Sequence, residues 1–159
     1  MLSAESLKQI DRELAKYPKE QNRSAIMGAL RIAQVELGYL SNETISYVAE
    51  YVGIPAAQAL EVATFYNMYD LHPIGKHKIT VCTNLPCALR GGMAAGEYLK
   101  EKLGIGFGET TADGKFTLME GECMGACGDA PVLIVNNHKM CSFMTKEAID
   151  QKLAEWGAN

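Results

Sequence analysis

The sequence has no long apolar run and no excess of positive charge, and each shortage excludes a class of protein. The longest apolar stretches, such as Val132–Val135, are far shorter than the roughly 20 residues of a membrane-spanning helix. A net charge of −4 argues against a nucleic-acid partner, because phosphates attract a basic surface. Met1–Ile10 lacks the charged and apolar regions of a secretory signal. We therefore expect a soluble, cytoplasmic protein with no direct membrane insertion.

The motifs of nucleotide sites and catalytic centres are also missing. Gly104–Gly108 (GIGFG) follows a predicted helix rather than a strand, which is the wrong context for a dinucleotide-binding loop. A phosphate loop ending at Gly114-Lys115 would need a glycine and a hydroxyl residue where Glu109 and Phe116 stand. There is no Cys-x-x-Cys, which argues against disulfide exchange. We predict no catalytic residues and no substrate site on this chain.

Five cysteines are present, and four of them form two close pairs, Cys82-x4-Cys87 and Cys123-x3-Cys127. Each pair follows a predicted strand, so neighbouring strand ends can bring the two pairs together. Soft thiolates select iron–sulfur clusters and zinc. The spacing favours an iron–sulfur cluster, while structural zinc and unrelated thiols or disulfides stay open as alternatives. Cys141 has no close partner and fits the role of a small buried hydrophobic residue.

The segments around the two pairs are rich in glycine and acidic residues. We expect the small residues Gly121, Gly125, Ala126 and Gly128 to let backbone amides approach sulfur atoms where larger side chains would collide. A helix predicted to begin near Ala88 should place its amide-rich end beside Cys87, where it would stabilise an anionic cluster. Three nearby carboxylates should lower the reduction potential, those of Glu120, Glu122 and Asp129.

The order of predicted elements indicates two domains. Residues 1–72 are predicted to form four short amphipathic helices, a small bundle or arm, with Ser3 and Ser41 as helix caps. Residues 75–159 are predicted to follow the order strand, helix, strand, strand, strand, helix. That order is typical of a thioredoxin-like domain, a mixed sheet flanked by helices, and gives an α+β or α/β fold class.

Local signals set the bounds of single elements. We predict helices over Arg23–Leu37 and Ala88–Leu103. Between strands at Val132–Val135 and Lys139–Phe143, the asparagines of Asn136-Asn137-His138 indicate a hairpin turn.

Two further features have both a structural and a functional interpretation. The aromatic cluster Phe65, Tyr66 and Tyr69 fits a docking surface, although packing in a core or linker is the default. Arg90 fits either a contact with a partner or cluster, or a solvated helix position.

Several motifs together closely resemble the thioredoxin-like [2Fe–2S] subunit of respiratory NADH:quinone oxidoreductase (complex I). The resemblance rests on the four-cysteine frame and on GIP (Gly53–Pro55), EVATFY (Glu61–Tyr66), TTADGKFTL (Thr110–Leu118) and C-x-G-x-C-x-x-A-P (Cys123–Pro131). It extends from about Leu7 to Trp156. Similar modules occur in NAD-linked hydrogenases and formate dehydrogenases, so the equivalent diaphorase subunit is an alternative, as is a zinc-binding interaction module.

The resemblance implies a thioredoxin-like domain with one [2Fe–2S] cluster, bound by Cys82, Cys87, Cys123 and Cys127. It also implies a neighbouring flavin subunit that binds NADH and FMN, and an adjacent iron–sulfur subunit. The cluster would exchange single electrons with FMN, beside the main chain of clusters that leads to quinone. By this resemblance the chain is a non-autonomous electron-transfer subunit, peripheral to the cytoplasmic membrane, and Cys141 lies outside the ligand set.

Overall fold

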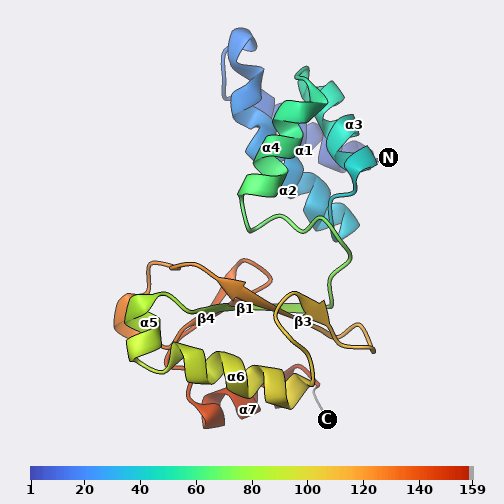
Figure 1. Ribbon diagram of the computed structural model, residues 1–159. Helices are drawn as coiled ribbons and strands as arrows, with labels where there is room; N and C mark the ends of the chain where they lie inside the picture. The colour runs from blue at the N-terminus through green and yellow to red at the C-terminus, as the bar shows by residue number, and fades with distance from the viewer. Residues whose placement is uncertain (158–159) are drawn as a thin grey trace. The chain divides into compact units, whose positions relative to one another are not determined.

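The computed structural model of the protein describes residues 1–157 (Figure 1). The chain forms two compact units, Met1–Pro73 and a second that begins at Ile74. Each unit has its own hydrophobic core. No helix within the described residues has the length and apolar character needed to cross a bilayer.

The first unit is helical (Figure 1). Its elements are α1 (Ala4–Leu14), the 3-10 helix Lys19–Ala25, α2 (Ile26–Leu37), α3 (Asn42–Val52) and α4 (Ala56–Phe65). Ser3 and Ser41 cap α1 and α3 as predicted, because each side-chain oxygen accepts a hydrogen bond from the backbone amide of the residue three positions on. Gly38 and Gly53 end α2 and α3 with φ values of 85° and 82°, which a glycine adopts without steric cost.

The predicted helix Arg23–Leu37 begins later than expected, at Ile26. Residues Lys19–Ala25 form a 3-10 helix instead, interrupted at Gln21 where φ is −119° and ψ is 28°. Ala25 is the one apolar residue of this stretch, so there is no apolar face to hold a regular α-helix against the core. From Ile26 onward the apolar face is continuous, and Leu30 is fully buried.

The second unit contains a five-stranded sheet of order β2-β3-β1-β4-β5. The strands are β1 (His77–Cys82), β2 (Glu109–Thr110), β3 (Phe116–Gly121), β4 (Leu133–Val135) and β5 (Lys139–Cys141). Strand β1 is central and pairs in parallel with β3 and antiparallel with β4, so the sheet is mixed as predicted. Two helices, α6 (Gly92–Leu103) and α7 (Lys146–Glu155), lie on one face of the sheet (Figure 1). The two-residue strand β2 was not predicted, because it is too short to show an alternating pattern.

The predicted hairpin between β4 and β5 is confirmed. Asn136 and Asn137 have φ values of 52° and 61°, which asparagine tolerates better than most residues. The Asn136 side chain also accepts a hydrogen bond of 2.8 Å from the Lys78 amide, and this bond fixes the turn against β1.

The core of the second unit fixes the register of the strands. Ile79 and Val81 of β1 and Leu118 of β3 are fully buried and belong to one apolar cluster with Leu99 of α6. Because a shift of one residue would turn these side chains to the opposite face, the register is strongly specified. That register ends with Cys82 opposite Gly121, at the end of the sheet where the cysteine-bearing segments begin.

Candidate metal centre

The first cysteine pair lies at the end of the central strand. Cys82 is the last residue of β1, and Cys87 lies inside α5 (Leu85–Leu89), a helix of five residues. Each of the two residues has only 1% of its surface exposed. The pKa of the Cys87 thiol is raised, first by burial and next by a hydrogen bond with Cys82. Both residues belong to one small apolar cluster with Ala130 and Val132.

The second pair lies on the loop that follows β3, residues 121–131, which we call the second cysteine loop. Cys123 and Cys127 are exposed, and their Sγ atoms are 3.7 Å apart. The Gly125 amide donates a hydrogen bond of 3.4 Å to Cys123 Sγ. Two thiolates on one tetrahedral metal, with bonds of about 2.3 Å, lie about 3.8 Å apart, so this pair has the spacing that one metal ion requires.

The sheet brings both pairs to the same end of the unit. The first cysteine loop, residues 82–91, leaves β1 at the point where the second cysteine loop leaves the parallel strand β3. The thiols act on one another electrostatically: Cys127 contributes to the raised pKa of Cys87, and Cys82 contributes to the raised pKa of Cys127. The hydrogen bond with Cys123 is the largest cause of the raised pKa of Cys127. Met124 and Ala126 of the second cysteine loop also pack against the apolar cluster that contains Cys82 and Cys87, so this loop lies against the buried pair.

The sulfur donors are arranged as two pairs. Among residues 1–157, no three Cys, His, Asp or Glu side chains surround one point closely enough to hold a single metal ion. A two-iron, two-sulfide cluster needs such pairs, because four thiolates are shared between two irons. The thiols must lose their protons when metal binds, since the thiolate is the ligand. Four thiol donors in two pairs would fit the ligand requirement of a [2Fe–2S] cluster.

The predicted single helix Ala88–Leu103 is wrong, because the structure divides it in two. Helix α5 ends at Leu89, Gly91 has a φ of 94°, and α6 begins at Gly92. A left-handed residue cannot continue a right-handed helix, and the apolar pattern does not reveal this break. Cys87 accordingly lies inside a one-turn helix, and the long helix α6 begins at Gly92 rather than at Ala88.

The three glycines of the second cysteine loop have different surroundings. A Cβ atom at Gly121 would collide with the side chain of Thr80 rather than with a cysteine sulfur. At Gly125 and Gly128 a Cβ would meet nothing within 4 Å. Gly125 is instead needed for its φ of 75°, which directs its amide toward Cys123.

The helix α6 approaches the backbone of the buried cysteines most closely at Gly92, a residue that the sequence analysis did not identify. A Cβ at Gly92 would lie 2.7 Å from the Cys82 carbonyl oxygen and 2.9 Å from that of Cys87. The first turn of α6 therefore packs directly against the backbone of both buried cysteines. The only sequence signal was the pair Gly91-Gly92 inside an apparent helix, which marks either a break or a close contact.

Polar side chains tie the two cysteine loops to their surroundings. Thr83 Oγ1 donates a hydrogen bond of 2.8 Å to Glu120 Oε1, and Ser142 Oγ donates one of 3.0 Å to Asp129 Oδ2. Asn84 Oδ1 is buried without a hydrogen-bond partner in the described chain. Two of the three predicted carboxylates are therefore held in place by hydroxyl groups at the edges of the site.

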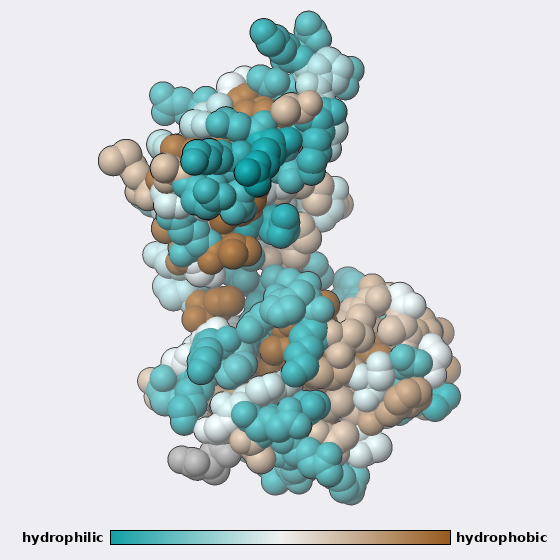
Figure 2. Space-filling model, turned by 180° about the vertical axis from the view of Figure 1, so that it is seen from behind, coloured by the Kyte–Doolittle hydropathy of each residue, from teal (hydrophilic) through white to brown (hydrophobic). Residues whose placement is uncertain are grey.

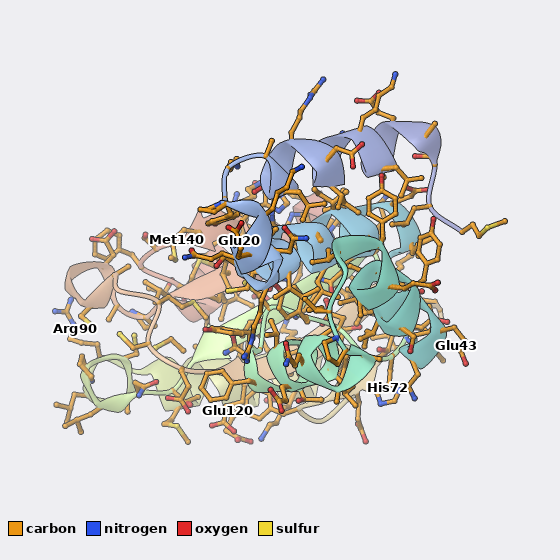
Figure 3. All side chains as sticks on the ribbon, turned by 90° about the horizontal axis from the view of Figure 1, so that it is seen from above. Glu20, Glu43, His72, Arg90, Glu120 and Met140 are labelled. Carbon is orange, nitrogen blue, oxygen red and sulfur yellow. The ribbon has the colours of Figure 1, made fainter. Side chains whose placement is uncertain are left out.

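The surface around this end of the unit is apolar. Leu85 and Leu89 of α5 have 71% and 78% of their surface exposed, and Met93 and Phe143 are also exposed. In Figure 2, white and pale brown residues gather over the end of the unit that carries α5. The Arg90 side chain is exposed and points outward from this end (Figure 3), while its backbone amide donates a hydrogen bond of 3.0 Å to the Cys87 carbonyl.

The remaining candidates lie away from the four cysteines. Cys141 is buried in the core of the second unit, and burial raises its pKa, as expected of a structural thiol. In the aromatic cluster, Tyr69 is buried and its hydroxyl donates to the Met27 carbonyl, whereas Phe65 is 79% exposed. Packing in the core thus explains the presence of an aromatic side chain at Tyr69 but not at Phe65.

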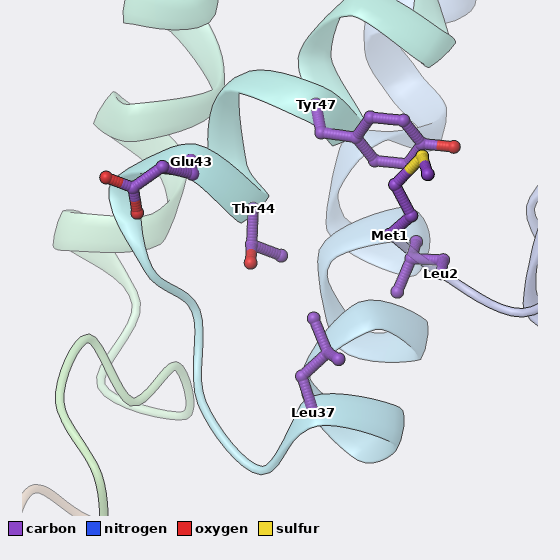
Figure 4. Close-up of a pocket in the computed structure, with 6 residues that line it drawn as sticks. All are labelled: Met1, Leu2, Leu37, Glu43, Thr44 and Tyr47. Carbon is purple, nitrogen blue, oxygen red and sulfur yellow. The ribbon is translucent and has the colours of Figure 1, made fainter.

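A cavity of about 270 Å3 lies in the helical unit (Figure 4). It is lined by Met1, Leu2, Leu37, Glu43, Thr44 and Tyr47. The pKa of Glu43 is lowered, chiefly by a hydrogen bond with the Ser41 side chain, which is part of the cap of α3. Helix capping explains the lowered pKa of Glu43, and the other polar side chains of the lining are the hydroxyl groups of Thr44 and Tyr47. The four-cysteine site is therefore the candidate functional site.

The chain is similar in sequence to one known protein family and to individual subunits of NADH-quinone oxidoreductases. Residues 10–157 match the family model of the thioredoxin-like [2Fe-2S] ferredoxin. The chain is 40% identical over 145 residues to NADH-quinone oxidoreductase subunit 2 of Thermus thermophilus, covering 91% of this chain and 80% of that one. It is 49% identical over 125 residues to an NADH-quinone oxidoreductase subunit of Rickettsia prowazekii, covering 78% of this chain and 71% of that one.

A solved structure shares the fold at lower sequence identity. An NAD+-reducing [NiFe]-hydrogenase in the H2-reduced state superposes with a TM-score of 0.69 and 18% identity. The match covers 82% of this chain and 22% of the hydrogenase chain.

Proposed function

The chain belongs to the thioredoxin-like [2Fe-2S] ferredoxin family, and on that premise we propose that it is an electron-transfer subunit of an NADH–quinone oxidoreductase. It carries one [2Fe–2S] cluster, with Cys82, Cys87, Cys123 and Cys127 as the four ligands. The observation that supports this assignment is the meeting of two thiol pairs at one end of the sheet, with Sγ atoms 3.7 Å apart in the exposed pair.

When bound, the cluster accepts and releases one electron at a time. The protein residues hold it and set its surroundings. The buried pair, Cys82 and Cys87, fixes it to the sheet, while the exposed pair leaves one side near the surface. Exposure on one side favours rapid exchange with an external donor or acceptor, because electrons need a short path to the partner.

The partner that we propose is a flavin subunit that binds NADH and FMN, with a further iron–sulfur subunit adjacent to it. The exposed apolar residues around the site support docking of another protein, since Leu85, Leu89 and Phe143 are each more than half exposed. We place the chain, through these partners, at the cytoplasmic face of the membrane as part of a peripheral assembly.

The degree of identity favours this assembly over a hydrogenase. The chain shares 40% and 49% identity with two NADH-quinone oxidoreductase subunits but 18% with the NAD+-reducing hydrogenase. A diaphorase role in a hydrogenase or formate dehydrogenase is therefore the second candidate. The similarity to the hydrogenase supports the same fold, not the same assembly.

The test is to isolate the native complex through a tag on this chain and to identify the companion chains. We expect an FMN-containing subunit and quinone-linked iron–sulfur subunits to copurify, and we expect NADH to reduce a [2Fe–2S] signal in the complex. Copurification with a nickel–iron or formate-oxidising subunit would favour the second candidate. A chain that purifies alone, without any flavoprotein, would rule out the proposed role.

A further inference from the structure

A side-chain hydrogen bond joins the two cysteine loops at their origin. Thr83 follows Cys82 directly, and Glu120 stands immediately before Gly121. Thr83 Oγ1 lies 2.8 Å from Glu120 Oε1 and donates to it. The Thr83 amide also donates to the Gly121 carbonyl at 3.4 Å. The same residue thus ties the first cysteine loop to the second by both backbone and side chain.

This bond lies where the strand ladder stops. The parallel pairing of β1 with β3 ends at Cys82 and Gly121, so beyond this point the two loops have no regular ladder to keep them together. A hydroxyl that donates to a carboxylate makes a stronger bond than a neutral pair does. The Thr83–Glu120 bond is therefore well placed to hold the distance between the buried and exposed thiol pairs.

The second acidic anchor of the site has a different partner. Asp129 Oδ2 accepts from Ser142, and the Asp129 carbonyl accepts from the Phe143 amide at 2.8 Å. Both partners follow β5, so Asp129 fastens the far end of the second cysteine loop to the body of the unit. Glu120, in contrast, fastens the beginning of that loop to the first cysteine loop.

We propose that Thr83 and Glu120 are positioning residues of the iron–sulfur site. Their hydrogen bond holds the two cysteine loops at the spacing that the cluster needs, which slows loss of the cluster. It also fixes the Glu120 carboxylate beside the site, where its negative charge makes the cluster harder to reduce. The inference rests on the proposed cluster assignment and adds two residues to the four ligands.

The size of each effect follows from the kind of interaction. Loss of a hydrogen bond of this type at a partly exposed position changes an equilibrium by about threefold to tenfold. Removal of one carboxylate charge beside the site, screened by water, changes the reduction equilibrium by about twofold to fourfold. The two effects have separate readouts, because the first changes retention of iron and the second changes the midpoint potential.

The experiment uses the purified complex and four variants. Thr83→Val removes the donor, Thr83→Ser keeps it, and Glu120→Gln removes the charge but keeps an acceptor of the same shape. Glu155→Gln is the matched control, because Glu155 is an exposed carboxylate of α7 that pairs with Lys152. Iron release to a chelator and the midpoint potential from an EPR-monitored redox titration are measured for each.

We expect Thr83→Val to release iron about threefold to tenfold faster, and Thr83→Ser to behave as the wild type. Glu120→Gln should favour the reduced cluster by about twofold to fourfold, with Glu155→Gln unchanged. Wild-type release rates and potentials in both Thr83→Val and Glu120→Gln would overturn the inference. If the unaltered complex holds no iron and sulfide on this chain, the proposed function fails instead, and the two failures are distinguishable.

Discussion

Replacement of Gly92 by alanine tests how the buried half of the site is built. A Cβ at this position would lie 2.7 Å from the Cys82 oxygen and 2.9 Å from the Cys87 oxygen. Real Cβ atoms essentially never approach another heavy atom this closely, so something must move. Both neighbours are backbone atoms of residues in a strand and in a helix, and they cannot rotate away as a side chain can. The alanine must therefore push α6 away from the two cysteines.

The cost can be bounded from known effects. Forcing an extra methyl group into a filled site destabilises a protein by about 1 to 3 kcal/mol. Alanine gains about 0.5 to 1 kcal/mol over glycine within a helix, which offsets part of this cost. We expect Gly92→Ala to lower the free energy of unfolding by about 1 to 2 kcal/mol. Because the cysteine backbone shifts with it, we also expect less iron to be retained.

The assay is urea unfolding of the cluster-free protein followed by circular dichroism, together with iron content after reconstitution. Gly128→Ala is the matched control. Gly128 lies on the second cysteine loop, a Cβ there would meet nothing within 4 Å, and its φ is not positive. We expect this control to unfold like the wild type. If Gly92→Ala unfolds at the same urea concentration and keeps full iron content, the close packing of α6 on the cysteine backbone is wrong.

Three further predictions concern single groups. Cys87→Ser should abolish or weaken the visible cluster absorption while Cys141→Ser leaves it nearly intact, and equal damage from both would mean a wrong ligand assignment. In the cluster-free protein, mass spectrometry should find Cys123 and Cys127 alkylated well before the buried Cys87, because exposure controls access to the reagent, and equal rates would contradict the structure. Burial raises the pKa of Tyr69 to about 12 from an ordinary value of 10.0. Since the folded state holds this proton more tightly, its contribution to stability is complete below about pH 10 and falls as the pH rises to about 12. Between pH 9 and pH 11, urea unfolding should show a larger loss of stability for the wild type than for Tyr69→Phe. Equal losses in the two proteins would refute the raised pKa of Tyr69.

Much of the fold follows from local signals that the structure confirms. Ser3 and Ser41 were predicted as caps because a hydroxyl there satisfies a free amide, and both make that bond. The hairpin at Asn136 and Asn137 was predicted from the tolerance of asparagine for positive φ. The mixed sheet followed from the order of strands and helices. For the caps and the hairpin, a few neighbouring residues determine the local structure.

The errors around the cysteine site arose where a distant part of the chain determines the local structure. The break between α5 and α6 depends on the packing of Gly92 against the backbone of Cys82 and Cys87, which no helical pattern contains. The Thr83–Glu120 bond joins residues far apart in the sequence, and it becomes visible only once β1 is paired with β3. The four cysteines were identified as a group from their spacing, but their arrangement as a buried and an exposed pair required the structure.

The content of iron, acid-labile sulfide and zinc in the anaerobically purified protein tests the central claim most directly. The account predicts about two irons and two sulfides for each chain, with charge-transfer absorption in the visible range. The same measurement on Cys127→Ser should give substantially less of both. One zinc ion for each chain, with no sulfide and no colour, would contradict the assignment of a [2Fe–2S] cluster to the four cysteines.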